Sequence, residues 1–315
     1  MTVREFVIAV VQVAIAVGCA PLLVGLMRVV RARFEGRVGP PITQPWRDLR
    51  KLWAKERIAP EHTSWVFLWA PVVLVASALV IAAVVPLVST ASRLDHVGDL
   101  FAVVALFMVG TVALALAGLD PGTAFGGMGA SREMTVAALA EPTLLLAVFA
   151  LAGRAGSSNL GAIVAATLHA PRSVVAVQSL LALVALAIAA LAECARLPVD
   201  NPNTHLELTM IHEAMVLEYA GPDLALVELA AAMRVLVFGA LIVNLFVPWG
   251  IATTTALPSI AVGAVALVAK LAVLGVALAV FEVFTAKIRL FRVPELLAVS
   301  FVVAFLAVTA AAFLG

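Results

Sequence analysis

Long apolar runs separated by short polar segments dominate this sequence. Because a helix needs about 20 apolar residues to cross about 30 Å of hydrocarbon, each long run predicts one membrane-spanning helix. The predicted spans are about 5–30, 64–90, 99–119, 133–153, 172–194, 224–249, 256–286 and 293–314. We therefore predict an all-α integral membrane protein of about eight transmembrane helices, with residues 1–315 forming a single membrane domain.

Composition supports this class. Apolar residues make up 64% of the chain and charged residues 12%, whereas a soluble domain is about half apolar and about a quarter charged. The net charge of +1 argues against nucleic acid as a partner. The two cysteines are too few for an iron–sulfur cluster or a zinc site. We expect no metal and no cofactor bound by this chain.

Basic residues predict the orientation. The loop 31–63, the loop 287–292, Arg132 and Arg196 together carry thirteen Lys and Arg, whereas the opposite loops carry four. By the positive-inside rule, the odd-numbered loops face the cytoplasm. We expect a multi-pass protein of the inner cell membrane with both termini outside the cytoplasm.

The first loop contains a pattern typical of a helix that lies on a membrane surface. Its apolar residues share one stripe: Trp46, Leu49, Leu52 and Trp53. Its basic residues lie largely away from that stripe: Arg47, Arg50, Lys51 and Lys55. This predicts an amphipathic interfacial helix. Its role stays open between an anchor for anionic lipid and a docking surface for a partner.

The fourth predicted span carries two carboxylates. Glu133 and Glu141 are eight residues apart, so they face broadly the same side of a helix. A carboxylate in hydrocarbon normally faces protein or water, and Pro142 frees a helix carbonyl close to Glu141. This predicts a polar pocket around Glu141. For Glu133, a residue at the membrane surface is the alternative.

The fifth loop holds the densest set of polar residues. Thr204 and Glu207 resemble a capping box and Gly221-Pro222 a stop, which predicts a short buried helix of about 16 residues. Its carboxylates and imidazoles could hold and pass protons, or could form ion pairs that only fix the loop. His212-Glu213 begins like a zinc-protease motif, but Val216 occupies the place of the second histidine.

Charged residues continue into the later spans. Glu228 and Arg234 lie in the sixth, and Lys270 and Glu282 in the seventh. They could neutralise one another in pairs, or form a polar axis across the membrane.

Several segments carry a resemblance to a known family. They are Arg37-Val38-Gly39-Pro40, Ser131-Arg132-Glu133-Met134, Leu197-Pro198-Val199-Asp200, Thr204 to Glu213 and Ala286 to Glu295. Together they resemble the membrane subunit of respiratory complex I called NuoH in bacteria and subunit 1 in mitochondria. Within that superfamily the chain looks closest to the HycD/HyfC-type subunit of formate hydrogenlyase and energy-converting nickel–iron hydrogenases.

The resemblance implies a subunit without its own redox centre, placed where a cytoplasmic arm meets the membrane arm. It implies hydrogenase-like large and small subunits, an iron–sulfur subunit and antiporter-like membrane subunits as partners. The nickel–iron centre and the iron–sulfur clusters would belong to those partners. Leu197-Pro198-Val199-Asp200 departs from the Ala-Pro-Phe-Asp stretch of complex I, which favours the hydrogenase branch.

Our hypothesis is a membrane-anchoring, proton-coupling subunit. The expected coupling residues are Glu133, Glu141, Glu193, Asp200, Glu207, Glu213, Glu218, Glu228, Arg234, Lys270 and Glu282. The expected docking residues for the arm are Arg37, Gln44, Asp48, Lys51, Lys55, Glu56, Arg196, His205 and His212. Three alternatives remain: a quinone-site subunit of a complex I-type NADH dehydrogenase, a stand-alone ion or solute transporter, and a purely structural anchor.

Overall fold

The computed structural model describes residues 3–90, 98–200 and 210–314. Within these ranges seven helices are long and apolar enough to cross a membrane. They are α1 (Val3–Phe34), α3 (Trp65–Val84), α4 (Leu100–Leu119), α5 (Ala124–Ala155), α9 (Gly221–Phe246), α10 (Leu257–Phe284) and α11 (Val293–Leu314). An eighth, α7 (Val177–Glu193), has 17 residues, the lower end of the spanning range. The prediction of an all-α membrane protein with about eight spans is confirmed.

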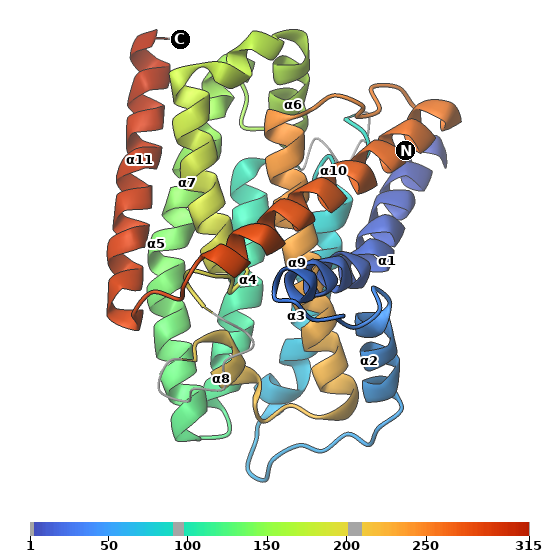
Figure 1. Cartoon of the computed structure of the whole chain (residues 1–315), viewed down its shortest axis with the longest axis vertical. Helices are drawn as coiled ribbons and strands as arrows, with labels where there is room; N and C mark the ends of the chain where they lie inside the picture. Colours follow the sequence, from blue (N-terminus) through green and yellow to red (C-terminus); the bar gives the residue numbers. More distant parts are fainter. Residues whose placement is uncertain (1–2, 91–97, 201–209, 315) are drawn as a thin grey trace.

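The helices form one bundle (Figure 1). α5, α7 and α11 run side by side, and α10 crosses the front of the bundle obliquely to pack against α1. The loop after α1, the α4–α5 turn and α8 (His212–Val216) lie at the lower end, whereas the two termini lie towards the upper end. The loops that the basic residues group together therefore share one end of the molecule.

Short elements complete the chain. α6 (Leu160–His169) and the 3-10 turn η2 (Pro171–Val175) precede α7, so the fifth span begins at Val177 and not at residue 172. A second 3-10 turn, η3 (Leu290–Arg292), precedes α11. The interfacial helix is present as α2 (Gln44–Trp53), with a proline in its first turn, and it packs on α9 and α1.

Local chemistry sets two boundaries that differ from the prediction. α3 ends at Val84 and not at residue 90, since Pro86 has no N–H to continue the helix. α5 begins at Ala124, nine residues before the predicted start, because the Thr123 hydroxyl accepts a hydrogen bond from the Gly126 N–H. Glu133 therefore lies well inside a helix.

The predicted 16-residue helix of the fifth loop is wrong in length. Among the described residues of that loop, only His212–Val216 is α-helical. A carboxylate oxygen of Asp200 accepts the His212 N–H at 3.3 Å, which places the helix start there. Gly221-Pro222 begins α9 and does not end a loop helix. The proposed capping box, Thr204 with Glu207, lies outside the described residues.

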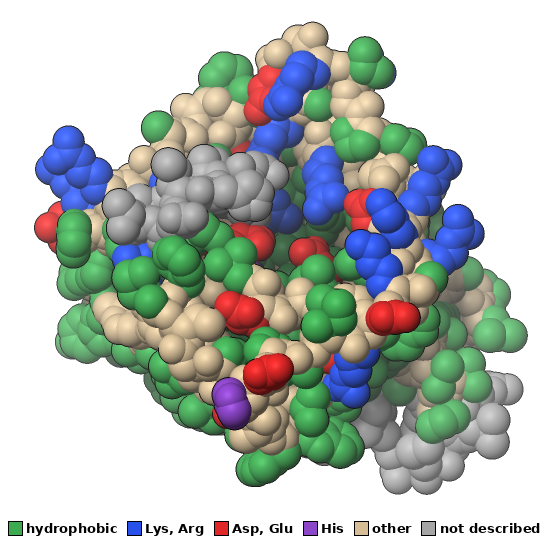
Figure 2. Space-filling model, turned by 90° about the horizontal axis from the view of Figure 1, so that it is seen from below, with side chains coloured by type: hydrophobic (Ala, Val, Ile, Leu, Met, Phe, Trp, Pro, Cys, Tyr) green, Lys and Arg blue, Asp and Glu red, His purple; other side chains and the backbone are tan. Residues whose placement is uncertain are grey.

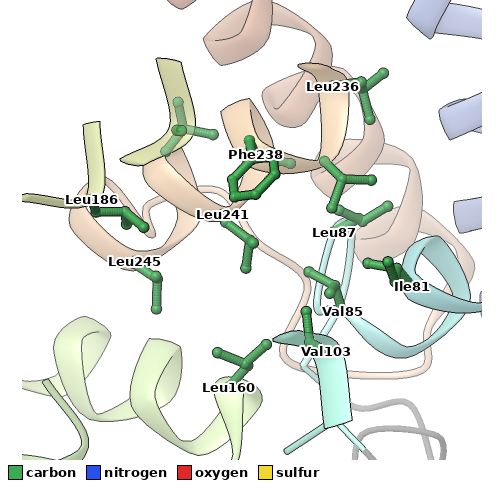
Figure 3. Close-up of a cluster of buried hydrophobic side chains, with 14 of the residues drawn as sticks. Ile81, Val85, Leu87, Val103, Leu160, Leu186, Leu236, Phe238, Leu241 and Leu245 are labelled. Carbon is green, nitrogen blue, oxygen red and sulfur yellow. The ribbon is translucent and has the colours of Figure 1, made fainter. Parts of the chain in front are cut away.

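α9 is the central helix of the bundle. In its most apolar stretch 67% of the residues are buried inside the protein, against 22% for α10 and α11. Figure 3 shows Phe238, Leu241 and Leu245 of α9 among leucines and valines from the surrounding elements. Phe238 also stacks on Phe107 of α4, with ring centroids 4.4 Å apart. Residues on α9 are therefore held in register with α3, α4, α6 and α7.

One close helix crossing gives a stability prediction. A β-carbon at Gly126 of α5 would lie 2.0 Å from the Gly118 carbonyl oxygen of α4, whereas one at Gly127 meets nothing within 4 Å. We expect Gly126→Ala to force the helices apart, to cost about 1–3 kcal/mol and to lower the melting temperature. Gly127→Ala is the matched control and should leave the melting temperature unchanged or raise it. Equal melting temperatures for the two variants would contradict this packing.

Candidate functional site

A cavity of about 340 Å³ opens at the lower end of the bundle, between α1, α2, α8, α9 and the end of α7. Its charged or titratable lining residues are Arg28, Arg31, Asp48, Glu193, Arg196, Asp200, His212, Glu213, Glu228, Arg234 and Glu282. Figure 2 shows this face of the molecule, with acidic side chains towards its middle and Lys and Arg side chains beside them. Most of the predicted coupling residues are thus brought together in one place.

Arg234 of α9 lies at the inner wall of this cavity. Its guanidinium is 3.7 Å from a carboxylate oxygen of Glu193 and donates to the Glu193 backbone carbonyl at 3.4 Å. It also donates to the Thr111 hydroxyl at 2.6 Å and the Phe107 carbonyl at 3.0 Å. This one side chain therefore connects α9 with the last residue of α7 and the middle of α4.

Glu282 of α10 lies between two arginines that are far from it in sequence. It is hydrogen-bonded to Arg31 of α1, and Arg196 lies 3.5 Å from its second carboxylate oxygen. The sequence analysis did not select Arg31. It could have been found, because α1 continues to Phe34 and Arg28 and Arg31 are then neighbours on one helical face.

Asp200 fixes the fifth loop to the connection between α10 and α11. Its carboxylate accepts a hydrogen bond from Lys287 at 2.7 Å and another from the His212 N–H. The Ile288 N–H donates to the Pro198 carbonyl at 3.1 Å beside it. Lys287 was counted only as a basic loop residue, since nothing in sequence marks a partner 87 positions away.

Glu133 and Glu141 of α5 are both buried, with 7% and 8% of their surface exposed. A membrane-surface position for Glu133 is therefore excluded. Arg132 points elsewhere and donates to the Met210 carbonyl at 2.7 Å. Both carboxylates lie within electrostatic reach of Glu193 and Arg234. The α5 carboxylates thus continue inward from the wall of the cavity.

Other predicted residues lie apart from the cavity. Lys270 donates to the Asn244 side chain at 3.3 Å between α10 and α9. Glu218 is half-buried after α8 and does not line the cavity. Glu207 and His205 lie outside the described residues. In the described part of the chain, no group of three or more His, Cys, Asp or Glu could hold a metal ion.

The predicted docking residues divide into two groups. Arg37, Lys51, Lys55 and Glu56 are exposed on the first loop. The other described members are Gln44, which donates to Asp48 at 2.8 Å, and the cavity-lining Asp48, Arg196 and His212.

Two titratable groups of the fifth loop have environments that shift them in opposite directions. Burial, with Arg234 adding to it, lowers the pKa of His212 to about 4, so the imidazole is neutral at pH 7. Burial and the charges of Glu228 and Asp200 raise the pKa of Glu213 to about 7, against the effect of Arg28. Glu213 therefore exchanges a proton with the cavity near neutral pH.

A bundle of about eight apolar helices that closes on a charged cavity at one end is an integral membrane subunit of the complex I type. The chain belongs to the NADH dehydrogenase family, whose model matches residues 6–312.

Individual relatives extend this result. The chain is 35% identical to formate hydrogenlyase subunit 4 of Escherichia coli over 94% of this chain and 95% of that protein. It is 36% identical to hydrogenase-4 component C of the same organism, over 78% and 76%. A subunit of the NADH-quinone oxidoreductase of Burkholderia vietnamiensis is 30% identical over 67% and 61%.

A solved structure shares the fold. It is a chain of the membrane-bound sulfane sulfur reductase, an archaeal respiratory membrane complex. The TM-score is 0.82 at 22% identity, and the match covers 98% of this chain and 99% of the other.

The Arg234–Glu193 pair predicts a double-mutant effect. Arg234→Met leaves a buried carboxylate without its cation, which costs about 3–5 kcal/mol. Adding Glu193→Gln removes that charge, so we expect the double variant to recover most of the lost melting temperature. If the two substitutions lower the melting temperature additively, the pair does not stabilise the bundle.

Glu213 predicts a titration that neighbouring charges control. Infrared spectra of the intact complex should gain a protonated-carboxyl band as the pH falls through about 7, and Glu213→Gln should remove it. Glu228→Gln should move this transition to lower pH, because Glu228 raises the pKa of Glu213. Arg28→Gln should move it to higher pH. A transition unaffected by both changes would contradict the assignment.

Proposed function

We propose that this chain couples electron transfer in a docked cytoplasmic arm to ion translocation, as the membrane subunit of an energy-converting hydrogenase-like complex. The carrying observation is the cavity, where carboxylates on α7, α8 and α9 meet buried basic residues at the end of the bundle that holds the predicted cytoplasmic loops. Subunits of formate hydrogenlyase and hydrogenase-4 are among its relatives.

The geometry supports a route for protons from the cavity into the bundle. Glu213 and Glu228 line the cavity, and Glu193 stands at its wall beside Arg234. Glu193 interacts electrostatically with Glu133 and Glu141 on α5. Glu141 and Glu193 each have one buried carboxylate oxygen that accepts no hydrogen bond. A charge change in the arm would shift protons along these groups, which then carry the change into the membrane.

The exposed first loop supports a docking role. Arg37, Lys51, Lys55 and Glu56 are all exposed there. They would contact hydrogenase-like large and small subunits and an iron–sulfur subunit, which would hold the nickel–iron centre and the iron–sulfur clusters. Antiporter-like subunits would lie beside the bundle in the inner membrane, with both termini of this chain outside the cytoplasm.

Replacement of the path carboxylates tests the coupling. We expect Glu141→Gln and Glu207→Gln to abolish proton or sodium pumping while the complex still assembles, because an amide keeps the shape but cannot carry a proton. Pumping is measured as ion uptake by inverted membrane vesicles, and assembly as the subunits that co-purify. Glu61→Gln is the matched control, since that carboxylate is exposed on the first loop.

The outcome separates this proposal from its alternatives. Normal pumping in both variants would leave a structural anchor, which tolerates amides. Ion transport by the purified chain alone in liposomes would instead identify a stand-alone transporter.

A quinone site is the second candidate function. The cavity volume lies within the usual range for small ligands, and part of its wall is apolar, with Val24, Met27 and Leu52. Photolabelling of the purified complex with an azido-quinone tests this candidate. Labelling of α1 and α2 that excess quinone suppresses would favour it, and absence of labelling would exclude it.

A further inference from the structure

We propose that the groove between α2 and α9 binds one anionic phospholipid. The groove has a volume of about 840 Å³ and lies on the opposite side of α2 from the charged cavity. Its apolar lining comes from Trp46, Leu49 and Trp53 of α2 and from Leu226 and Leu229 of α9. This site is separate from the coupling residues and does not depend on the proposed function.

The position of the groove places it at the boundary between lipid headgroups and hydrocarbon. α9 begins at Gly221 and is a membrane span, so Leu226 and Leu229 lie about 8–12 Å along it. The indole N–H of Trp46 donates to the Gly18 carbonyl of α1 at 3.1 Å, which holds α2 against the spans. Tryptophans are enriched at this depth in membrane proteins.

Charge selects the class of lipid. Arg47 and Arg50 border the groove, and both are exposed. Neither guanidinium has a carboxylate partner in the described part of the chain. Asp48, the only acid of α2, turns away, accepts from Gln44 and lies 3.7 Å from Arg28. Two guanidiniums above an apolar floor complement a phosphate group that carries acyl chains.

A bound lipid would also touch the wall of the functional cavity. Leu49 lines the groove and the cavity, so an acyl chain in the groove packs against the helix that closes one side of the cavity. The lipid would thereby hold α2 on α9.

Photolabelling of the intact complex tests this site. The complex is placed in phosphatidylcholine vesicles that contain a trace of phosphatidylglycerol with a photoreactive diazirine in one acyl chain. After irradiation, mass spectrometry should find the label on the peptides of α2 and on Leu226 to Leu229. A phosphatidylcholine carrying the same diazirine should label these peptides much less.

Substitutions then test the role of charge. One basic residue near an anionic surface changes binding about fivefold, so Arg47→Gln with Arg50→Gln should reduce the labelling about 25-fold. Arg47→Lys with Arg50→Lys keeps the charges and should keep the preference for phosphatidylglycerol. Arg289→Gln with Arg292→Gln is the matched control, because both arginines are exposed and line neither the groove nor the cavity.

Three results would overturn the proposal. The first is equal labelling by the two lipids, and the second is undiminished labelling in the Arg47→Gln/Arg50→Gln variant. The third uses a photoreactive amino acid at Ala54, which also lines the groove. Its cross-linking to a partner subunit and not to lipid would show that a protein segment occupies the groove.

Discussion

The guanidinium of Arg234 is a charge inside an apolar bundle, and the rest of the structure depends on how it is neutralised. An unpaired ion in such a place costs several kcal/mol, so the charge requires partners. It finds them in the carboxylate and the terminal carbonyl of Glu193, in the Thr111 hydroxyl and in the Phe107 carbonyl. Because these groups belong to α7 and α4, the pairing fixes the two helices on opposite sides of the central α9.

The same constraint organises the segments around the cavity. Glu282 joins α10 to α1 through Arg31 and to the fifth loop through Arg196. Asp200 joins that loop to Lys287, which follows α10. Each pair neutralises a buried charge and links segments that are far apart in sequence. The cavity therefore has fixed charged walls, and that arrangement suits groups that must respond to charge in a docked arm.

α2 occupies a position between two environments. One side contributes Asp48 to the charged cavity, and the other contributes Trp46 and Trp53 to an apolar groove on the membrane side. The amphipathic pattern that left lipid anchoring and partner docking open is thus compatible with both. If the groove holds a lipid, the composition of the membrane acts on a wall of the proposed coupling site.

The sequence by itself determined the membrane class, the spans, the interfacial helix and the family. These follow from the length of apolar runs and from local motifs, which need no knowledge of distant contacts. It also placed Glu141 inside a span, where a carboxylate must face protein. The length of the fifth-loop helix was not predictable in this way, since the side chain of Asp200 takes the His212 N–H and sets its start.

Only the tertiary structure decided which charges meet. Glu282 and Arg31 are 251 positions apart, and Lys270 contacts Asn244 and not the carboxylates around the cavity. Helical periodicity shows which face of its own helix a residue occupies, but not which neighbour that face meets. That choice follows from packing the whole bundle, where the cost of an unpaired buried charge acts across all the helices together.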